Sequence, residues 1–76
     1  MVEDKHKVYI KINTNNEIID INSSIFIQNF TGWIEVDSGF GDKYAHSQSH
    51  YLDNPLINDE GEYNYKYENG EIKNLV

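Results

Sequence analysis

Residues 7–22 read KVYIKINTNNEIIDIN and carry a strand, turn and strand pattern. Apolar and polar residues alternate from Val8 to Ile12 with the period of two that is typical of a half-buried strand. Residues 14–16 (TNN) favour a turn, because asparagine tolerates positive φ and can hydrogen-bond its own backbone. The alternation then resumes, with Ile19 and Ile21 expected on the same face. The stretch therefore predicts an antiparallel hairpin.

Two further patterns extend the sheet. Residues 33–37 (WIEVD) alternate again and predict a third strand, in which Trp33 favours a core position over a contact surface. Residues 62–68 and 72–76 flank Asn69-Gly70, the dipeptide typical of a two-residue type I′ hairpin. The predicted fold class is mostly β: a small antiparallel sheet built from an N-terminal hairpin, a third strand, a long packed loop and a C-terminal hairpin.

Two segments lack a strand pattern. Residues 23–30 (SSIFIQNF) fit either a short helical turn capped by serine or an irregular bridge. Residues 38–59 have no periodicity, and a loop of roughly twenty residues is long for a small domain. Its aromatic residues Phe40, Tyr44 and Tyr51 do not suit a solvated linker, so we expect this segment to pack on something.

The 76 residues suffice for one domain, which we place at residues 7–76 after a flexible N-terminal segment, residues 1–6. A chain of this size buries only about 60% of the surface of its unfolded form, so the core must be thin. The sequence contains no cysteine, which excludes disulfides and thiolate metal sites. Association with another chain is then the leading way to reinforce the fold, with a metal behind it.

The net charge is -7, from 13 acidic residues and six lysines with no arginine. This charge repels phosphate backbones and anionic membrane surfaces, so neither nucleic acid nor a membrane is an expected partner. No apolar stretch suits a signal peptide or a membrane span. We expect a protein made in the cytosol that stays there or leaves inside a larger particle.

His46 and His50 are the main candidates for chemistry, since on a helix this spacing points both imidazoles to one side. Asp42 or Asp53 could supply a third metal ligand. A surface or hydrogen-bonded histidine pair is nevertheless favoured over a metal site, because the spacing alone is weak. The glycine, serine and acidic clusters lack the context of a phosphate loop, a nucleophile elbow or a calcium loop. We therefore predict no catalytic residue, no cofactor and no enzyme activity.

Aromatic residues suggest binding instead. The alternation of Tyr63, Tyr65 and Tyr67 places them on one face, either as the core side of a hairpin or as a contact surface. The predicted interface combines this face with the central segment, residues 39–56. Its members are Phe40, Tyr44, His46, Gln48, Tyr51, Leu52, Tyr63, Tyr65 and Tyr67.

Most of the chain from Val8 onward resembles small proteins and protein tails of phages and prophages of Gram-positive bacteria. The residues that carry the resemblance are Gly32-Trp33-Ile34-Glu35-Val36-Asp37, Gly41-Asp42-Lys43-Tyr44-Ala45-His46-Ser47-Gln48, Tyr51, Pro55, Tyr63-Asn64-Tyr65-Lys66 and Asn69-Gly70. Ser47 stands where the pattern has alanine. The resemblance implies a place near the fibre and baseplate of a phage tail or a tail-like particle, and it carries over no catalytic residue.

The leading hypothesis is thus a structural module that binds tail fibre or baseplate proteins, with self-association as a further possibility. The alternative is an intracellular phage accessory, either a fibre-assembly chaperone or an acidic inhibitor of a host nucleic-acid enzyme. The charge of -7 suits such an inhibitor, although the acids are mixed with asparagines and tyrosines. Catalysis is a third possibility, with Asp42, His46 and His50 as its site.

Overall fold

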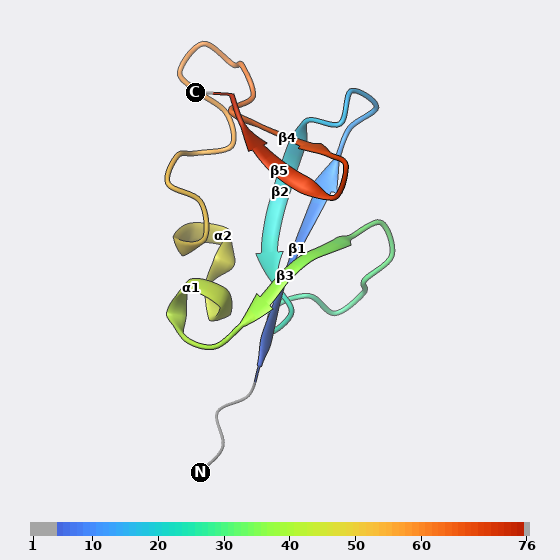
Figure 1. Cartoon of the computed structure of the whole chain (residues 1–76), viewed down its shortest axis with the longest axis vertical. Coiled ribbons are helices and arrows are strands. Elements are labelled where there is room, and N and C mark those ends of the chain that lie inside the picture. The colour runs from blue at the N-terminus through green and yellow to red at the C-terminus, as the bar shows by residue number, and fades with distance from the viewer. Residues whose placement is uncertain (1–4, 76) are drawn as a thin grey trace.

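A computed structural model describes residues 5–75 of the chain. Within this range five strands and two single-turn helices follow one another (Figure 1). They are β1 (His6–Ile12), β2 (Ile18–Ser23), β3 (Ile34–Gly39), α1 (Asp42–Ala45), α2 (Ser47–His50), β4 (Tyr65–Glu68) and β5 (Glu71–Asn74). The predicted mostly β fold with antiparallel pairing is confirmed. Residues 1–4 of the predicted N-terminal segment lie outside the described residues, and His6 is already part of β1.

The predicted N-terminal hairpin is present, with β1 and β2 antiparallel. Its turn is built by asparagines: the Asn13 carbonyl accepts the Asn16 N–H at 3.1 Å, and Asn16 has φ 63°. The Asn13 side chain accepts the backbone N–H groups of Asn15 and Glu17, at 2.9 and 3.0 Å. These bonds satisfy the turn locally, which is why this sequence reverses the chain here.

A β-bulge changes the face on which Ile19 lies. Lys11 pairs with Asp20 while the next residue, Ile12, pairs with Ile18, so Ile19 is left without a cross-strand partner. The Ile18 side chain is fully buried, whereas Ile19 is 42% exposed. The expectation that Ile19 and Ile21 lie on the same face is therefore wrong, because one extra residue in a strand reverses the alternation beyond it and Ile21 is buried.

The third predicted strand is also present, as β3. It pairs antiparallel with β1, and the resulting three-stranded sheet has the order β2-β1-β3. Trp33 precedes the strand, is half-buried and lies outside the core cluster, with Lys11 Nζ 4.6 Å from its ring centroid. The preference for Trp33 in the core is thus not met, because Lys11 belongs to the side of β1 that alternates away from Ile10.

The C-terminal hairpin forms around Asn69 and Gly70, whose φ angles of 53° and 78° match the predicted type I′ turn. Its first strand begins at Tyr65 rather than at residue 62. Tyr63 instead forms an isolated bridge with Ile57.

The two sheets meet where β2 begins. Glu17 forms an antiparallel bridge with Lys66, and the Tyr67 N–H donates to the Asn16 carbonyl at 2.8 Å. The β4–β5 hairpin is therefore attached through β4, next to the first turn, as Figure 1 shows.

The core lies between the three-stranded sheet and the elements that cover its inner face. Its buried members are Val8, Ile10, Ile18, Ile21 and Tyr65. The partly buried residues packed against them are Ile12, Ile34, Val36, Tyr44, Tyr51, Leu52, Leu56, Tyr67 and Ile72. Four of these belong to the central segment, so the predicted long packed loop is present, and it contains two helical turns and covers the chain's own core.

Candidate protein-binding surfaces

The predicted interface residues of the central segment, residues 39–56, fall into two groups. The side chains of Tyr44, Tyr51 and Leu52 pack against the core, whereas Phe40 is 55% exposed. His46 and Gln48 are exposed on the helical turns. In so small a protein the aromatic residues of this segment are needed to complete the core, which leaves fewer of them for a partner.

The three tyrosines predicted to share one face, Tyr63, Tyr65 and Tyr67, also differ in burial. The Tyr65 side chain is 3% exposed, so its prediction as a contact residue is wrong. Tyr67 packs beside it, and Tyr63 is half-buried ahead of β4. The Tyr65 hydroxyl oxygen accepts the backbone N–H of Asn54 at 3.0 Å, which joins the hairpin to the central segment. For Tyr65 and Tyr67, the structure therefore agrees with the other interpretation, in which the tyrosine face is the core side of the hairpin.

Asp42, His46 and His50 do come together. The Asp42 Oδ1 atom lies 2.7 Å from His46 Nδ1, and its Oδ2 atom lies 2.7 Å from His50 Nδ1. Asp42 begins α1, His46 lies between the two helices and His50 ends α2, so the two consecutive turns place all three on one side. Asp42, rather than Asp53, thus contacts both histidines.

This cluster is open to solvent, because its three side chains are each about half exposed. Among residues 5–75, no group of three or more His, Cys, Asp or Glu side chains is arranged to hold a metal ion. Asp42 contacts both imidazoles and thereby ties the two helical turns together.

A second polar contact fixes the end of α2 against β3. The Tyr51 hydroxyl donates to Asp37 Oδ2 at 2.7 Å, while Asp37 Oδ1 accepts the Ser38 N–H, also at 2.7 Å. Burial, and then the hydrogen bond and the charge of Asp37, raise the pKa of the Tyr51 hydroxyl well above its ordinary value. The folded state therefore holds this proton more tightly than the unfolded state.

We expect Tyr51→Phe to lower the free energy of unfolding at neutral pH by about 1 kcal/mol, because Asp37 loses a hydrogen-bond donor. The raised pKa stabilises the fold fully below about pH 10, and this stabilisation is lost as the pH rises further. Urea unfolding between neutral pH and about pH 11 should thus show a smaller alkaline loss for Tyr51→Phe than for the wild type. Tyr63→Phe is the control, and an equal effect in both variants would contradict the assignment.

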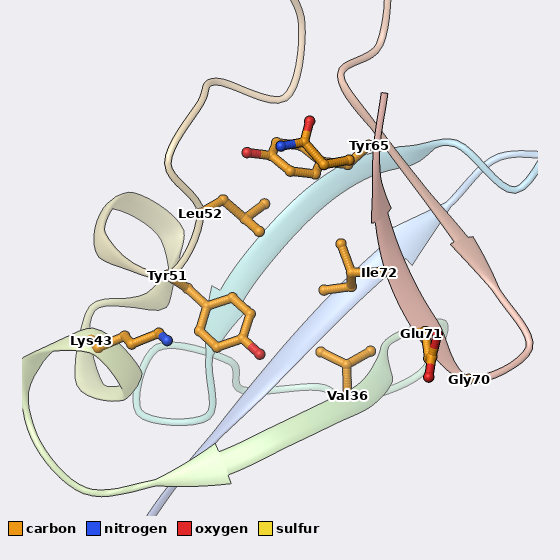
Figure 2. Close-up of a pocket in the computed structure, with 9 residues that line it drawn as sticks. Val36, Lys43, Tyr51, Leu52, Tyr65, Gly70, Glu71 and Ile72 are labelled. Atoms are coloured by element: carbon orange, nitrogen blue, oxygen red, sulfur yellow. The ribbon is translucent and has the colours of Figure 1, made fainter. Parts of the chain in front are cut away.

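An open groove of about 460 Å³ separates the C-terminal hairpin from β3 and from the segment after α2. Figure 2 shows Val36, Leu52 and Ile72 pointing into it, with Lys43 and Glu71 on opposite sides. The other lining residues are Tyr51, Tyr65, Gly70 and Asn74. The groove thus combines apolar and polar lining, with one charge of each sign among its residues.

The connection between β2 and β3 exposes large apolar side chains that the sequence did not single out as contact residues. Ile25, Phe26 and Phe30 are 53, 49 and 45% exposed. The Phe26 ring lies 5.8 Å from that of His46, and the Phe30 ring lies 4.9 Å from that of Tyr9. We call these three residues the 25–30 apolar surface. The sequence allowed a short helical turn or an irregular bridge for residues 23–30. The structure has a single turn that begins at Ser23, and irregular backbone follows it.

One signal in the sequence could have revealed this surface. Residues 25–30 carry four large apolar side chains within six positions. An irregular segment outside the sheet cannot turn all of them inward, and here only Ile27 is buried.

Comparison of this chain with protein-family models, with curated protein sequences and with solved structures finds no match. Neither helix in the part of the chain that the structure describes is long and apolar enough to cross a membrane.

Proposed function

We propose that this protein is a structural assembly module of a phage or phage-tail-like particle, in which it binds tail fibre or baseplate proteins. The resemblance of its central and C-terminal motifs to phage and prophage proteins supports a location in such a particle. The exposed apolar side chains support the binding role, and they are the observation that carries the proposal.

The balance between buried and exposed apolar side chains favours binding. Within the described residues, six hydrophobic side chains are buried and seven large ones are exposed. Single exposed apolar residues are common on proteins, but three on one short connection form a local concentration. The 25–30 apolar surface holds two phenylalanines, a residue type enriched at protein interfaces. A partner that covers it would remove this apolar area from water.

The net charge indicates the kind of partner surface. A charge of -7 on 76 residues favours approach to a positively charged protein and repels an acidic one. We therefore expect the fibre or baseplate surface that receives this module to be basic, and association to slow as the salt concentration rises.

Phe26→Ala and Phe30→Ala are each expected to weaken binding to fibre or baseplate protein about tenfold, or ~1.4 kcal/mol, because each removes half-exposed apolar area. Calorimetric titration with the purified tail proteins measures this. Ile57→Ala is the matched control, since Ile57 is 46% exposed on a different connection. Equal losses at all three positions, or no loss at any, would contradict a role for the 25–30 apolar surface.

Mass spectrometry of purified particles tests the location. We expect the protein to be present in particles at a stoichiometric level and to remain after high-salt washing. Its absence from particles, together with capture of a basic nucleic-acid enzyme from the host, would overturn the proposal. That outcome would favour the intracellular accessory role that the charge of -7 also suits.

A further inference from the structure

Strand β5 has an edge that pairs with no other strand of the described chain. The sheet order is β4-β5, and β4 is the strand bridged to the three-stranded sheet. Glu68 and Glu71 flank the two-residue turn and are therefore a hydrogen-bonded pair, so the next pair, Tyr67 and Ile72, is not. The N–H and C=O of Ile72 consequently point away from β4. Glu71 and Lys73, on either side of Ile72, are both exposed.

The charges on this hairpin are placed unfavourably for an isolated pair of strands. Glu68 lies directly opposite Glu71, and Lys66 lies directly opposite Lys73. Like charges in directly opposite positions destabilise a sheet. The compensating contact is diagonal, between Lys73 Nζ and Glu68 Oε2 at 3.2 Å. A strand of the right charge order on the other side of β5 would supply the opposite charges that β4 does not.

We infer that β5 pairs antiparallel with β5 of a second copy of this chain, about a twofold axis at Ile72. Ile72 then lies opposite Ile72 of the second copy, and the two residues exchange both of their outward backbone hydrogen bonds. Glu71 lies opposite Lys73 of the second copy, and the symmetry repeats this pair on the other side. The two hairpins become one four-stranded antiparallel sheet.

The other registers are disfavoured by charge. A parallel arrangement in register puts Glu71 opposite Glu71 and Lys73 opposite Lys73. Moving the antiparallel register by two residues in either direction again brings a like-charge pair to the axis. Charged residues on an edge normally prevent pairing with foreign strands. Here their order, acidic then basic around one isoleucine, is complementary to itself.

The expected association is weak, because a four-residue edge buries less area than a standard interface and because each of the two copies carries a net charge of -7. We expect a dissociation constant on the order of 100 µM for free protein. Multiple copies held in one particle would raise the local concentration and favour the pairing. The inference concerns contact between copies, so it does not depend on which tail protein the 25–30 apolar surface binds.

Charge exchange tests the register. We expect Glu71→Lys and Lys73→Glu each to weaken self-association at least tenfold in sedimentation equilibrium from about 10 µM to 1 mM. An equimolar mixture of the two variants should associate again, because every Lys then faces a Glu. The double variant E71K/K73E should self-associate like the wild type for the same reason.

The same variants also provide a control for a loss of folding. Glu71→Lys replaces the Glu68–Glu71 pair by an opposite-charge pair and keeps the Lys73–Glu68 contact, so its melting temperature should not fall below that of the wild type. A wild type that stays monomeric up to about 1 mM would overturn the inference. So would single variants that dimerise as the wild type does, or a mixture that fails to associate. Phe26→Ala should leave self-association unchanged, which separates this outcome from failure of the proposed partner binding.

Discussion

Ile18→Ala is expected to lower the free energy of unfolding by about 2–5 kcal/mol, which is comparable to the whole stability of a core of this size, about 3–5 kcal/mol. The Ile18 side chain is fully buried in the core, opposite Ile12. Its loss leaves a cavity that a thin core cannot refill, because few neighbouring side chains are available to move in. Circular dichroism at 25 °C should show a largely unfolded variant, or a midpoint at very low urea.

Ile19→Ala is the matched control, since it makes the same chemical change one residue further along the same strand. Ile19 is 42% exposed and unpaired in the bulge, so we expect a loss below about 1 kcal/mol. Equal losses at the two positions, or a larger loss at Ile19, would show that the bulge is not where the register places it.

Gly39→Ala is expected to destabilise the protein by about 1–3 kcal/mol through overpacking. A Cβ atom at this position would lie 2.5 Å from Cε2 and 2.6 Å from Cζ of Tyr44. Tyr44 is held against the core and beside Tyr51, with ring centroids 6.0 Å apart, so its ring has little room to withdraw. Urea unfolding of the variant measures the loss.

A double-mutant cycle identifies the cause. In a Tyr44→Ala background the ring is absent, and Gly39→Ala should then cost less than about 0.5 kcal/mol. If Gly39→Ala costs the same in both backgrounds, the contact with the Tyr44 ring does not explain the loss. The cycle thus tests the close approach that joins the end of β3 to α1.

Most of the fold could be predicted from short-range patterns. The asparagines before β2 and the Asn69-Gly70 pair specify their turns through local hydrogen bonds and positive φ, which do not depend on distant residues. The apolar alternation in β1 identified Val8 and Ile10 as core residues, and both are fully buried. The bulge at Ile19 could not be predicted in this way, because it arises from the pairing of β2 with β1.

The candidate sites were predicted less completely. The spacing of Asp42, His46 and His50 was enough to suggest a cluster, since consecutive helical turns bring such residues to one side. The exposure of Phe26 and the burial of Tyr65 did not follow from spacing. Both depend on which segment covers the inner face of the sheet.

A small acidic β domain with two hairpins follows from the amino-acid sequence, because alternation and turn chemistry act within a few residues of the chain. Which aromatic residues complete the core and which remain exposed depends on how the distant segments pack. Burial is shared among segments distant in sequence, since Tyr65 belongs to the buried core and Tyr44 and Tyr51 pack against that core from another segment. Phe26 and Phe30 lie on the connection between β2 and β3 and remain about half exposed.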